Sequence, residues 1–253
     1  AIGMHFAPSS PRWLVEKDPD YLLTYPTALG GLLDCFESTG QRPRKLGEVR
    51  TIGETLSPAL RARCQAVLGV PIVDAYSAQE VGAIALQCPD SGLYHVHAEG
   101  LIVEVLNPDG GACAPGETGR VVVTELHHFA TPLIRYELRD YAEVGPACPC
   151  GRGLPTLTRV LGRQRNMVVL PNGQRYWPLV GLHQFRSIGQ ILQYQLIQHD
   201  LSQVEMRLVT AEKLTPAAEA RLIETVQAAL GHPFQIQLNY VAGELERSAG
   251  GKF

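Results

Sequence analysis

Cysteine is scarce in this sequence, with 6 residues in a chain of 253. Small secreted domains that are held together by disulfides carry a much higher density of cysteine, so the composition excludes that class of protein. So few thiols in a long chain are typical of a protein that works in a reducing compartment. We therefore expect a cytoplasmic protein.

Basic residues are not in excess, and long hydrophobic runs are missing. The chain has 22 Lys and Arg residues against 25 Asp and Glu residues, for a formal net charge of -3. A protein that binds nucleic acid or an anionic membrane surface usually presents a positive field, so we expect neither partner. No apolar run approaches the roughly 20 residues that span a bilayer. The start, AIGMHFAPSSPRW, has no basic region followed by an apolar stretch, as a secretory signal would.

The remaining composition is that of an ordinary globular protein. Hydrophobic residues make up 45% of the chain and charged residues 19%, and the length allows one large domain or two smaller ones. A strand-like run followed by a helix occupies residues 20–39, and a strand at 45–54, a helix at 57–69 and a buried strand at 70–76 follow it. This alternation is typical of an α/β fold with a parallel or mixed sheet.

Two of the predicted helices have complete boundary signals. Each begins at a hydroxyl side chain that can cap the first turn, continues with a proline and ends at a glycine. The residues are Ser57, Pro58 and Gly69 for the first helix, and Thr215, Pro216 and Gly231 for the second.

The pattern changes twice along the rest of the chain. From residue 101 it becomes rich in strands, with segments such as LIVEVLNPDG separated by turns that contain Gly and Pro. We place a domain boundary between Arg163 and Asn166, and we expect a large domain over residues 1–161 and a small α+β domain over residues 162–253. The elements predicted for the small domain are a helix near 178–188, strands near 190–198 and 203–209, a helix at 215–230 and a strand at 234–241.

Polar residues crowd the end of the buried strand in VDAYSAQEVG, residues 73–82. Loops at the carboxyl ends of strands are where α/β sheets bind ligands. Tyr76 can stack on an aromatic base, and Glu80 can hold Mg²⁺. The alternative is an ordinary strand end, in which Ser77 caps a helix and Glu80 is solvated.

Two later stretches carry a similar signal. In TPLIRYELRDYAEVG, residues 131–145, Asp140 follows a strand and offers a carboxylate that can hold the two vicinal hydroxyls of a ribose. The alternative is a surface charge cluster of Arg135, Arg139 and Asp140. In LGRQRNMVVLPNGQRYWP, residues 161–178, Gly162 and Arg163 lie at the predicted domain boundary, and the alternative is a linker with solvated arginines.

An independent signal comes from three cysteines and a histidine. CPDSGLYH places Cys88 and His95 around a short loop with a glycine, and CPC contains Cys148 and Cys150. Three thiolates and an imidazole make a closed tetrahedral Zn²⁺ set with no position left open for catalysis, so we expect a structural zinc. His97 is the alternative to His95 as a ligand, and inert thiols or a disulfide are the alternatives to zinc.

In their order and spacing, these motifs resemble those of the adenylate-forming superfamily of acyl-CoA synthetases and adenylation domains. The resemblance is greatest to its phenylacetate–CoA ligase branch, many members of which carry a similar Cys/His and CxC set, and it covers essentially the whole chain. The matching stretches are Tyr76-Ser77-Ala78-Gln79-Glu80, Arg135-Tyr136-Glu137-Leu138-Arg139-Asp140, Gly162-Arg163, the upstream Gly53-Glu54 and the carboxyl-terminal Gly251-Lys252.

The resemblance implies a fold and a set of residue roles. The fold is α/β: the remainder of a large adenylate-forming domain, with a mixed sheet and a β-rich subdomain, precedes a small α+β lid domain. Tyr76 would stack on adenine, Asp140 would hold the ribose hydroxyls, and Arg163 would lie near the ribose and phosphate. Glu80 would bind Mg²⁺, and Lys252, on a glycine-rich arm, would reach the acyl carboxylate and the α-phosphate. The remaining nucleotide-binding positions would be Ser77 and, in the adenine pocket, Gly53, Glu54 and Asp74.

The activity that the resemblance implies is that of an ATP-dependent, AMP-forming ligase. Such an enzyme would convert an aromatic or other carboxylic acid into an acyl-adenylate and then transfer the acyl group to a thiol, of coenzyme A or of a carrier protein. ATP or AMP, Mg²⁺ and a structural Zn²⁺ would be its cofactors. The walls of the acid pocket would include Tyr25, Ala75, Tyr136 and residues 83–86. The alternatives are a non-catalytic, zinc-stabilised scaffold and an adenylating enzyme with a carrier-protein, amine or hydroxyl acceptor.

The chain also departs from the family pattern. It contains no Ser/Thr/Gly-rich phosphate loop and does not begin with Met, so we expect it to be the carboxyl-terminal part of a longer protein. Arg165 stands at the hinge where the family usually has an acidic residue, which alters the expected lid rotation. Ser77 and Gln79 replace a glycine and a hydroxyl residue, which alters the expected contacts with Mg²⁺ and phosphate.

Overall fold

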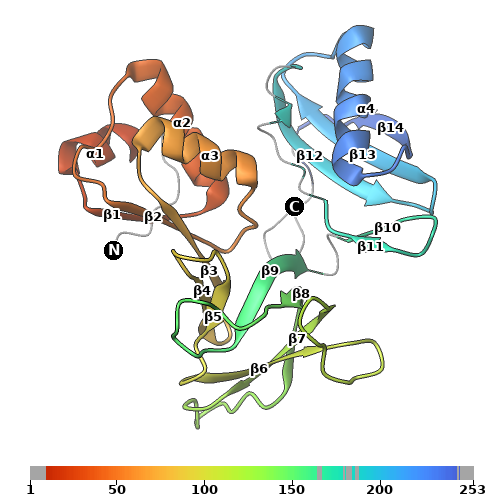
Figure 1. The fold of residues 1–253 in the computed structure, drawn as a ribbon. Coiled ribbons are helices and arrows are strands. Elements are labelled where there is room, and N and C mark those ends of the chain that lie inside the picture. The colour runs from red at the N-terminus through yellow and green to blue at the C-terminus, as the bar shows by residue number, and fades with distance from the viewer. Residues whose placement is uncertain are drawn as a thin grey trace. The chain divides into compact units, whose positions relative to one another are not determined.

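The computed structural model describes residues 10–163, 167–178, 180, 184, 185, 188–243 and 245. The chain divides by its internal contacts into two compact units, residues 1–164 and residues 165–253. The first unit contains a large mixed sheet and helices, and the second is a small α+β unit (Figure 1). The predicted mixed α/β fold with a small carboxyl-terminal domain is confirmed.

A nine-stranded sheet runs through the first unit in the order β1-β2-β3-β4-β5-β9-β8-β7-β6. The first three strands are parallel, and all neighbours from β3 onward are antiparallel. The strands are β1 Tyr21–Thr24, β2 Glu48–Ile52, β3 Ile72–Ala78, β4 Gly82–Gln87, β5 Tyr94–Val96, β6 Leu101–Leu106, β7 Thr118–Glu125, β8 Tyr136–Val144 and β9 Thr156–Arg163. The helices of this unit are α1 Ser10–Lys17, α2 Pro26–Thr39 and α3 Pro58–Leu68.

Helices pack on the parallel half of this sheet. One face of α2 is apolar and buried, and Leu29 and Leu33 on this face are fully buried. They share one core with Val49 of β2 and Ile72 of β3. A helix that buries such a stripe against a sheet is stabilised mainly by this contact, which fixes the position of β2 and β3 relative to the helices.

The predicted boundary signals of two helices are confirmed. The hydroxyls of Ser57 and Thr215 each accept a hydrogen bond from the amide three residues later, at the start of α3 and of α4 Pro216–Leu230. Gly69 and Gly231 end these helices with φ of 74° and 68°, a left-handed conformation that glycine adopts without steric cost.

The antiparallel half encloses its own core. Val121 and Val123 of β7 are fully buried and pack with Leu138 of β8 and Leu157 of β9. This packing holds β7, β8 and β9 side by side, as Figure 1 shows. The ends of β8 and β9 that carry predicted site residues are thereby fixed against each other.

The second unit is built on β12 Ile191–Gln198, β13 Gln203–Thr210 and β14 Gln235–Tyr240, and α4 connects β13 to its parallel neighbour β14. Met206 and Leu208 of β13 pack on Leu222 and Val226 of α4, and all four are fully buried. A short pair, β10 Val168–Val169 and β11 Arg175–Tyr176, precedes them. The predicted strands near 190–198, 203–209 and 234–241 are present, whereas the predicted helix near 178–188 lies largely outside the described residues.

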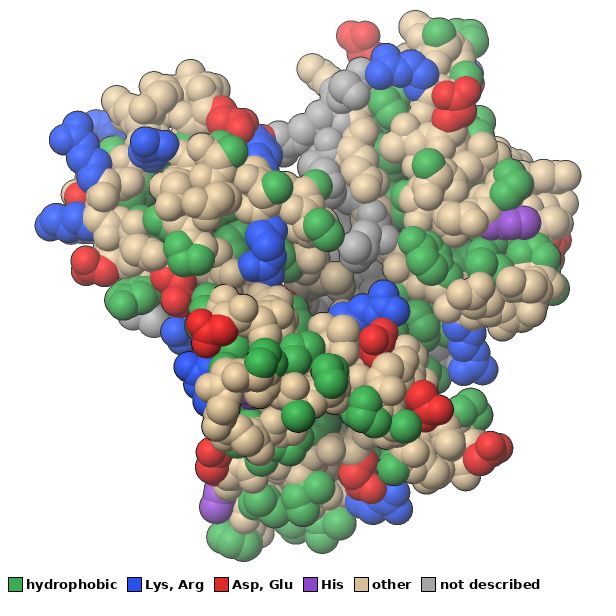
Figure 2. All heavy atoms as spheres, viewed as in Figure 1, with side chains coloured by type: hydrophobic (Ala, Val, Ile, Leu, Met, Phe, Trp, Pro, Cys, Tyr) green, Lys and Arg blue, Asp and Glu red, His purple; other side chains and the backbone are tan. Residues whose placement is uncertain are grey.

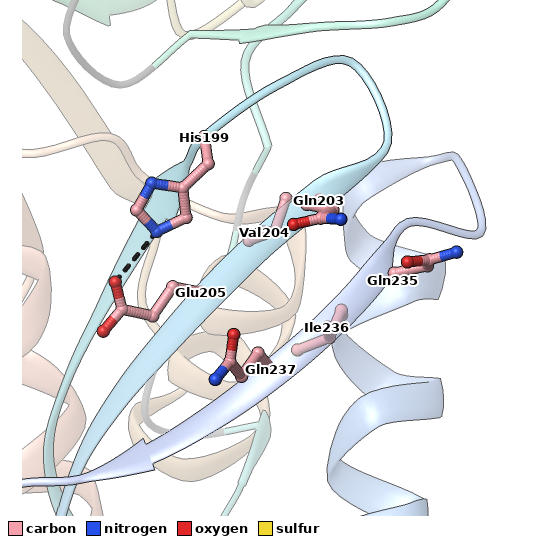
Figure 3. A pocket seen from close by; sticks show the side chains of 7 residues that line it. All are labelled: His199, Gln203, Val204, Glu205, Gln235, Ile236 and Gln237. Carbon is pink, nitrogen blue, oxygen red and sulfur yellow. Dashed lines mark hydrogen bonds and ion pairs between the residues drawn. The ribbon is translucent and has the colours of Figure 1, made fainter.

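A recess of about 360 Å³ opens on the second unit beside the face of the sheet that α4 does not cover. Glu205 in this recess is 8% exposed, and its carboxylate forms hydrogen bonds with His199, Arg207 and Asn239 at 2.9–3.0 Å. Figure 3 shows the His199 ring pointing toward Glu205. The three bonds, that from Asn239 first, lower the pKa of Glu205 to about 2. None of the predicted site residues lines this recess. It is lined by His199, Gln203, Val204, Glu205, Gln235, Ile236 and Gln237.

Substitution of Glu205 by glutamine should lower the free energy of unfolding of the second unit at neutral pH by about 1 kcal/mol, because a neutral amide replaces the carboxylate in these hydrogen bonds. Folding lowers the pKa of Glu205, so its contribution is complete at neutral pH and is lost as the pH falls from about 4.5 toward 2. Urea denaturation of the wild type and of Glu205→Gln, measured from about pH 7 to 3, gives the free energy of unfolding of each protein. The difference between the two free energies should become smaller below about pH 5. The exposed Glu212→Gln is the control, and a difference that did not depend on pH would contradict the prediction.

Acidic and basic side chains are interspersed over the face of the protein that Figure 2 shows. This distribution agrees with the near balance of charges in the sequence. Of the helices in the described parts of the chain, none is long and apolar enough to cross a membrane.

Candidate functional site

The end of β3 and the turn after it carry the first predicted motif. The pairing of β3 with β4 is irregular between Tyr76 and Ser77, and a bulge of this kind re-aims the side chains at a strand end. Glu80 lies exposed in the turn that connects the two strands. The chain continues into β4 and not into a helix, so the alternative in which Ser77 caps a helix is wrong.

Tyr76, Asp140 and Arg163 meet in the structure, although Tyr76 and Asp140 are 64 residues apart. The Tyr76 hydroxyl donates to Asp140 Oδ2 at 2.8 Å, and Arg163 Nε lies 3.7 Å from Asp140 Oδ1. The register of β8 and β9 pairs Asp140 directly with Arg163. Burial, together with the neighbouring Asp140 carboxylate, raises the pKa of Tyr76, so the phenol remains protonated and can donate at neutral pH. Three of the predicted nucleotide-binding residues therefore form one cluster.

Burial determines what Tyr76 contributes to this cluster. The residue is 7% exposed, and its ring packs in the core of the antiparallel half with Ile84 and Val96. Its hydroxyl thereby positions Asp140, which is 9% exposed. Stacking of an adenine on the Tyr76 ring stays a prediction.

The backbone next to Asp140 is strained. Arg135 and Arg139 have φ of 48° and 60°, in the left-handed region that residues with a Cβ rarely adopt. Such a conformation costs about 1–2 kcal/mol per residue and persists only where the surrounding structure holds it. Arg135 is paired with Glu104, and Asp140 is buried, so the alternative of a solvated surface cluster is wrong for Asp140.

Asp74 has protein donors on both carboxylate oxygens. The Thr51 hydroxyl donates to Oδ1, and the Tyr94 hydroxyl donates to Oδ2 at 2.6 Å. The residue is 7% exposed, and burial raises the pKa of its carboxyl. Both carboxylate oxygens of Asp74 are thus held in place by neighbouring strands, and its role in an adenine pocket stays a prediction. Sequence reasoning did not identify Thr51 and Tyr94, although Thr51 is a polar residue on the inward face of a strand, which is a usable signal.

Gly53 and Glu54 lie beside the start of α2. Gly53 has φ of 74°, and a Cβ on it would lie 2.9 Å from Tyr25 Cε1, so only glycine fits there. The Glu54 carboxylate accepts from the amide and the hydroxyl of Thr27, at 2.9 Å each. The turn after β2 is thereby tied to the first turn of α2. It brings two predicted adenine-pocket residues next to Tyr25, a predicted wall of the acid pocket.

The four predicted zinc ligands converge. Cys88 follows β4, His95 lies in β5, and Cys148 and Cys150 lie in the β8–β9 loop, yet their ligand atoms all lie within 4.8 Å of one another. The Cys88 and Cys148 sulfurs are 3.9 Å apart, and Cys150 Sγ lies 3.3 Å from His95 Nε2. Zn–S bonds of about 2.3 Å and Zn–N bonds of about 2.0–2.1 Å require separations of about 3.8 and 3.6 Å in a tetrahedron. The group fits a tetrahedral Zn²⁺, and it contains His95 and not His97.

The surroundings of Cys88 favour its thiolate, whereas the pKa of Cys148 is raised, despite its hydrogen bond with Ser91, by burial and by the side chains of Cys150 and Cys88. The Ser91 hydroxyl lies 3.1 Å from Cys148 Sγ, and Arg152 Nη1 lies 3.6 Å from Cys88 Sγ. Hydrogen bonds, that of Ser91 first, lower the pKa of Cys88 to about 6, and the thiolate is the form that binds metal. His95 Nδ1 is buried without a hydrogen-bond partner among the described residues, and Nε2 is the ring atom that faces the cluster. All six cysteines are free, so the disulfide alternative is wrong.

The predicted catalytic arm lies outside the described residues. Lys252 and Gly251 belong to that part of the chain, as does Arg165 at the predicted hinge. The roles of these residues stay predictions. Arg163 is the last described residue of β9 before the predicted hinge, and Gly162 before it has φ of 94°, which glycine alone adopts readily.

Comparisons with known proteins agree on the kind of relative. The CapK C-terminal domain family matches residues 179–253. The chain is 30% identical over 161 residues to the phenylacetate-coenzyme A ligase of Aromatoleum evansii, which covers 60% of this chain and 36% of that relative. It is 26% identical over 231 residues to the phenylacetate-coenzyme A ligase of Thermus thermophilus. This match covers 84% of this chain and 52% of that relative. The chain spans between 36% and 56% of the length of the curated relatives that it matches.

Solved structures share the fold. A 2-hydroxyisobutyryl-CoA ligase in complex with R3-HIB-AMP superposes with a TM-score of 0.71 at 20% identity, over 96% of this chain and 56% of that chain. The o-succinylbenzoate CoA synthetase of Bacillus subtilis in complex with OSB-AMP superposes with a TM-score of 0.69 at 16% identity, over 98% and 52%. Both units of the chain therefore have the architecture of these ligases.

Proposed function

The chain belongs to the adenylate-forming ligase superfamily as a distant relative of the phenylacetate-CoA ligases, and on that premise we propose that it takes part in ATP-dependent, AMP-forming activation of a carboxylic acid. The acid, aromatic or other, would be converted to an acyl-adenylate and transferred to a thiol. The names of its relatives favour coenzyme A as the acceptor over a carrier-protein thiol.

The contact between Tyr76, Asp140 and Arg163 carries this proposal. These residues come from β3, β8 and β9, and they were predicted from separate motifs. In the proposed role, Asp140 receives the ribose hydroxyls, since its carboxylate lies between a neutral donor, Tyr76, on one side and a cation, Arg163, on the other. Arg163 has the positive charge that a nearby phosphate requires.

The remaining groups have supporting roles. Glu80, exposed in the β3–β4 turn, would bind a hydrated Mg²⁺, the form that a single carboxylate holds. The ammonium group of Lys252 would stabilise the negative charge that develops on the α-phosphate and the acyl carboxylate. Gly53, Glu54, Asp74 and Ser77 would shape the site around the nucleotide.

We also propose that Cys88, His95, Cys148 and Cys150 hold a structural Zn²⁺. Four protein ligands complete a tetrahedron, so the ion has no position for a substrate and would supply stability instead of Lewis-acid chemistry. Arg152 near Cys88 would offset part of the negative charge of three thiolates. The proposal for the metal is independent of the proposal for the ligase.

Two measurements test the ligase proposal. Calorimetric titration of AMP into this chain should show binding, and ATP–pyrophosphate exchange by the natural full-length protein should depend on an added carboxylic acid. Because Lys252 is proposed to act on the reacting groups, Lys252→Ala should abolish most of the exchange and leave AMP binding nearly unchanged. Absence of exchange across a panel of aromatic and aliphatic acids would overturn the ligase proposal and favour the non-catalytic, zinc-stabilised scaffold.

A further inference from the structure

Tyr94 connects the metal cluster to the candidate nucleotide site. It precedes the predicted ligand His95 on β5, and it is 8% exposed. Its hydroxyl donates to Asp74 Oδ2 at 2.6 Å, across from β5 to β3. The proposed ligand set does not use Tyr94, and no role in nucleotide binding was predicted for it.

Gln87 makes a second connection between the same two places. Its Nε2 donates to the Gly92 carbonyl at 2.9 Å, inside the metal loop, which we define as residues 88–95. Its Oε1 accepts from the Asp74 amide at 3.3 Å and from Arg61 Nη2 at 2.6 Å. The metal loop is therefore connected to Asp74 by two routes. Tyr94 forms a hydrogen bond with the Asp74 carboxylate, and Gln87 forms hydrogen bonds with both the Asp74 amide and the loop.

The contacts that hold Asp74 also affect Tyr76, which lies two residues later on β3. Residues two apart on a strand share a face, so Asp74 and Tyr76 point the same way, and the Tyr76 hydroxyl donates to Asp140. β3, β4 and β5 are neighbours in the sheet (Figure 1). A shift of the metal loop would therefore displace Asp74 and, through it, the tyrosine that positions Asp140.

We infer that Tyr94 is a positioning residue that couples the metal cluster to the nucleotide site, so that metal and nucleotide bind cooperatively. This inference rests on the proposed nucleotide and metal sites. Bound metal holds the loop in the geometry in which Tyr94 and Gln87 fix Asp74. Coupling between two binding equilibria is reciprocal, so AMP must raise the affinity for Zn²⁺ by the same factor by which Zn²⁺ raises the affinity for AMP.

The test measures zinc affinity in the intact chain by competition with a chelator of known affinity, with and without saturating AMP. We expect AMP to raise the zinc affinity of the wild type about 5-fold or more, the lower end of typical coupling. In Tyr94→Phe the effect should fall below about twofold, because the phenol that reaches Asp74 is gone while all four ligands remain.

Two variants serve as controls. Thr51→Val removes the other hydroxyl donor to Asp74 but leaves the metal loop untouched, so the effect of AMP on zinc affinity should persist. Asp140→Ala, which should bind AMP weakly, corrects for zinc that AMP itself sequesters.

The outcomes separate this inference from the proposed function. AMP that binds the wild type without changing its zinc affinity overturns the coupling alone, and this comparison requires no variant to fold. A Tyr94→Phe protein that retains the full effect overturns the role of Tyr94. A wild type that binds no AMP overturns the proposed nucleotide site and the coupling with it.

Discussion

Removal of the zinc proposed at the Cys88, His95, Cys148 and Cys150 cluster should lower the melting temperature of the protein by about 8–16 °C. A ligand that binds only the folded state stabilises it by about 4.1 kcal/mol when its free concentration is 1,000 times its dissociation constant. In a protein of this size, each kcal/mol corresponds to about 2–4 °C. The effect is large because the four ligands come from three separate segments of the chain, which the proposed metal would bind at one point.

Differential scanning fluorimetry before and after chelation provides the measurement, together with metal analysis of protein purified without a chelator. Cys150→Ala should lose the metal and melt at the temperature of the chelated wild type, with no further change when chelator is added. Cys35→Ala is the matched control, since Cys35 lies in α2 and outside the cluster, and it should retain both metal and melting temperature. Less than one zinc per chain, or equal melting temperatures with and without chelator, would contradict the prediction.

The sequence was sufficient for features that depend on a few neighbouring residues. The caps at Ser57 and Thr215 and the ends at Gly69 and Gly231 were predicted and observed, because a cap involves only residues within one turn. The set of cysteines and His95 was identified because metals restrict the ligand types to very few.

Features that depend on strand register were not predicted. The contacts of Asp74 with Thr51 and Tyr94 arise because β2, β3, β4 and β5 are neighbours, and nothing in a single sequence fixes that order. The left-handed conformation of Arg139 contradicts the preference of its own residue type, so local propensity predicts the opposite. The hydrogen bond from the Tyr76 hydroxyl to Asp140 was also not predictable from the sequence and was identified only in the structure.

Substitution of Asp140 by alanine should weaken AMP binding about 100-fold, which is the second large effect that we expect. The proposed site uses the Asp140 carboxylate for the two ribose hydroxyls, and a hydrogen bond to a charged group contributes about 1.5–3 kcal/mol. The variant also leaves the Tyr76 hydroxyl buried without its acceptor, at a cost of about 1–3 kcal/mol in stability. Calorimetric titration gives the affinity, and thermal unfolding shows whether the variant is still folded at the temperature of the titration.

A nucleotide without ribose hydroxyls separates a contact with the ligand from a structural role of Asp140. 2′,3′-Dideoxy-AMP should bind the wild type about as weakly as AMP binds Asp140→Ala, and the substitution should change its affinity by less than about threefold, because the hydroxyls and their acceptor form one thermodynamic cycle. Asp140→Asn keeps an oxygen acceptor for Tyr76. Its affinity for AMP should lie between that of the wild type and that of Asp140→Ala. If Asp140→Ala weakened both nucleotides equally, the loss would come from disturbance of Tyr76 and its surroundings, and the ribose contact would be wrong.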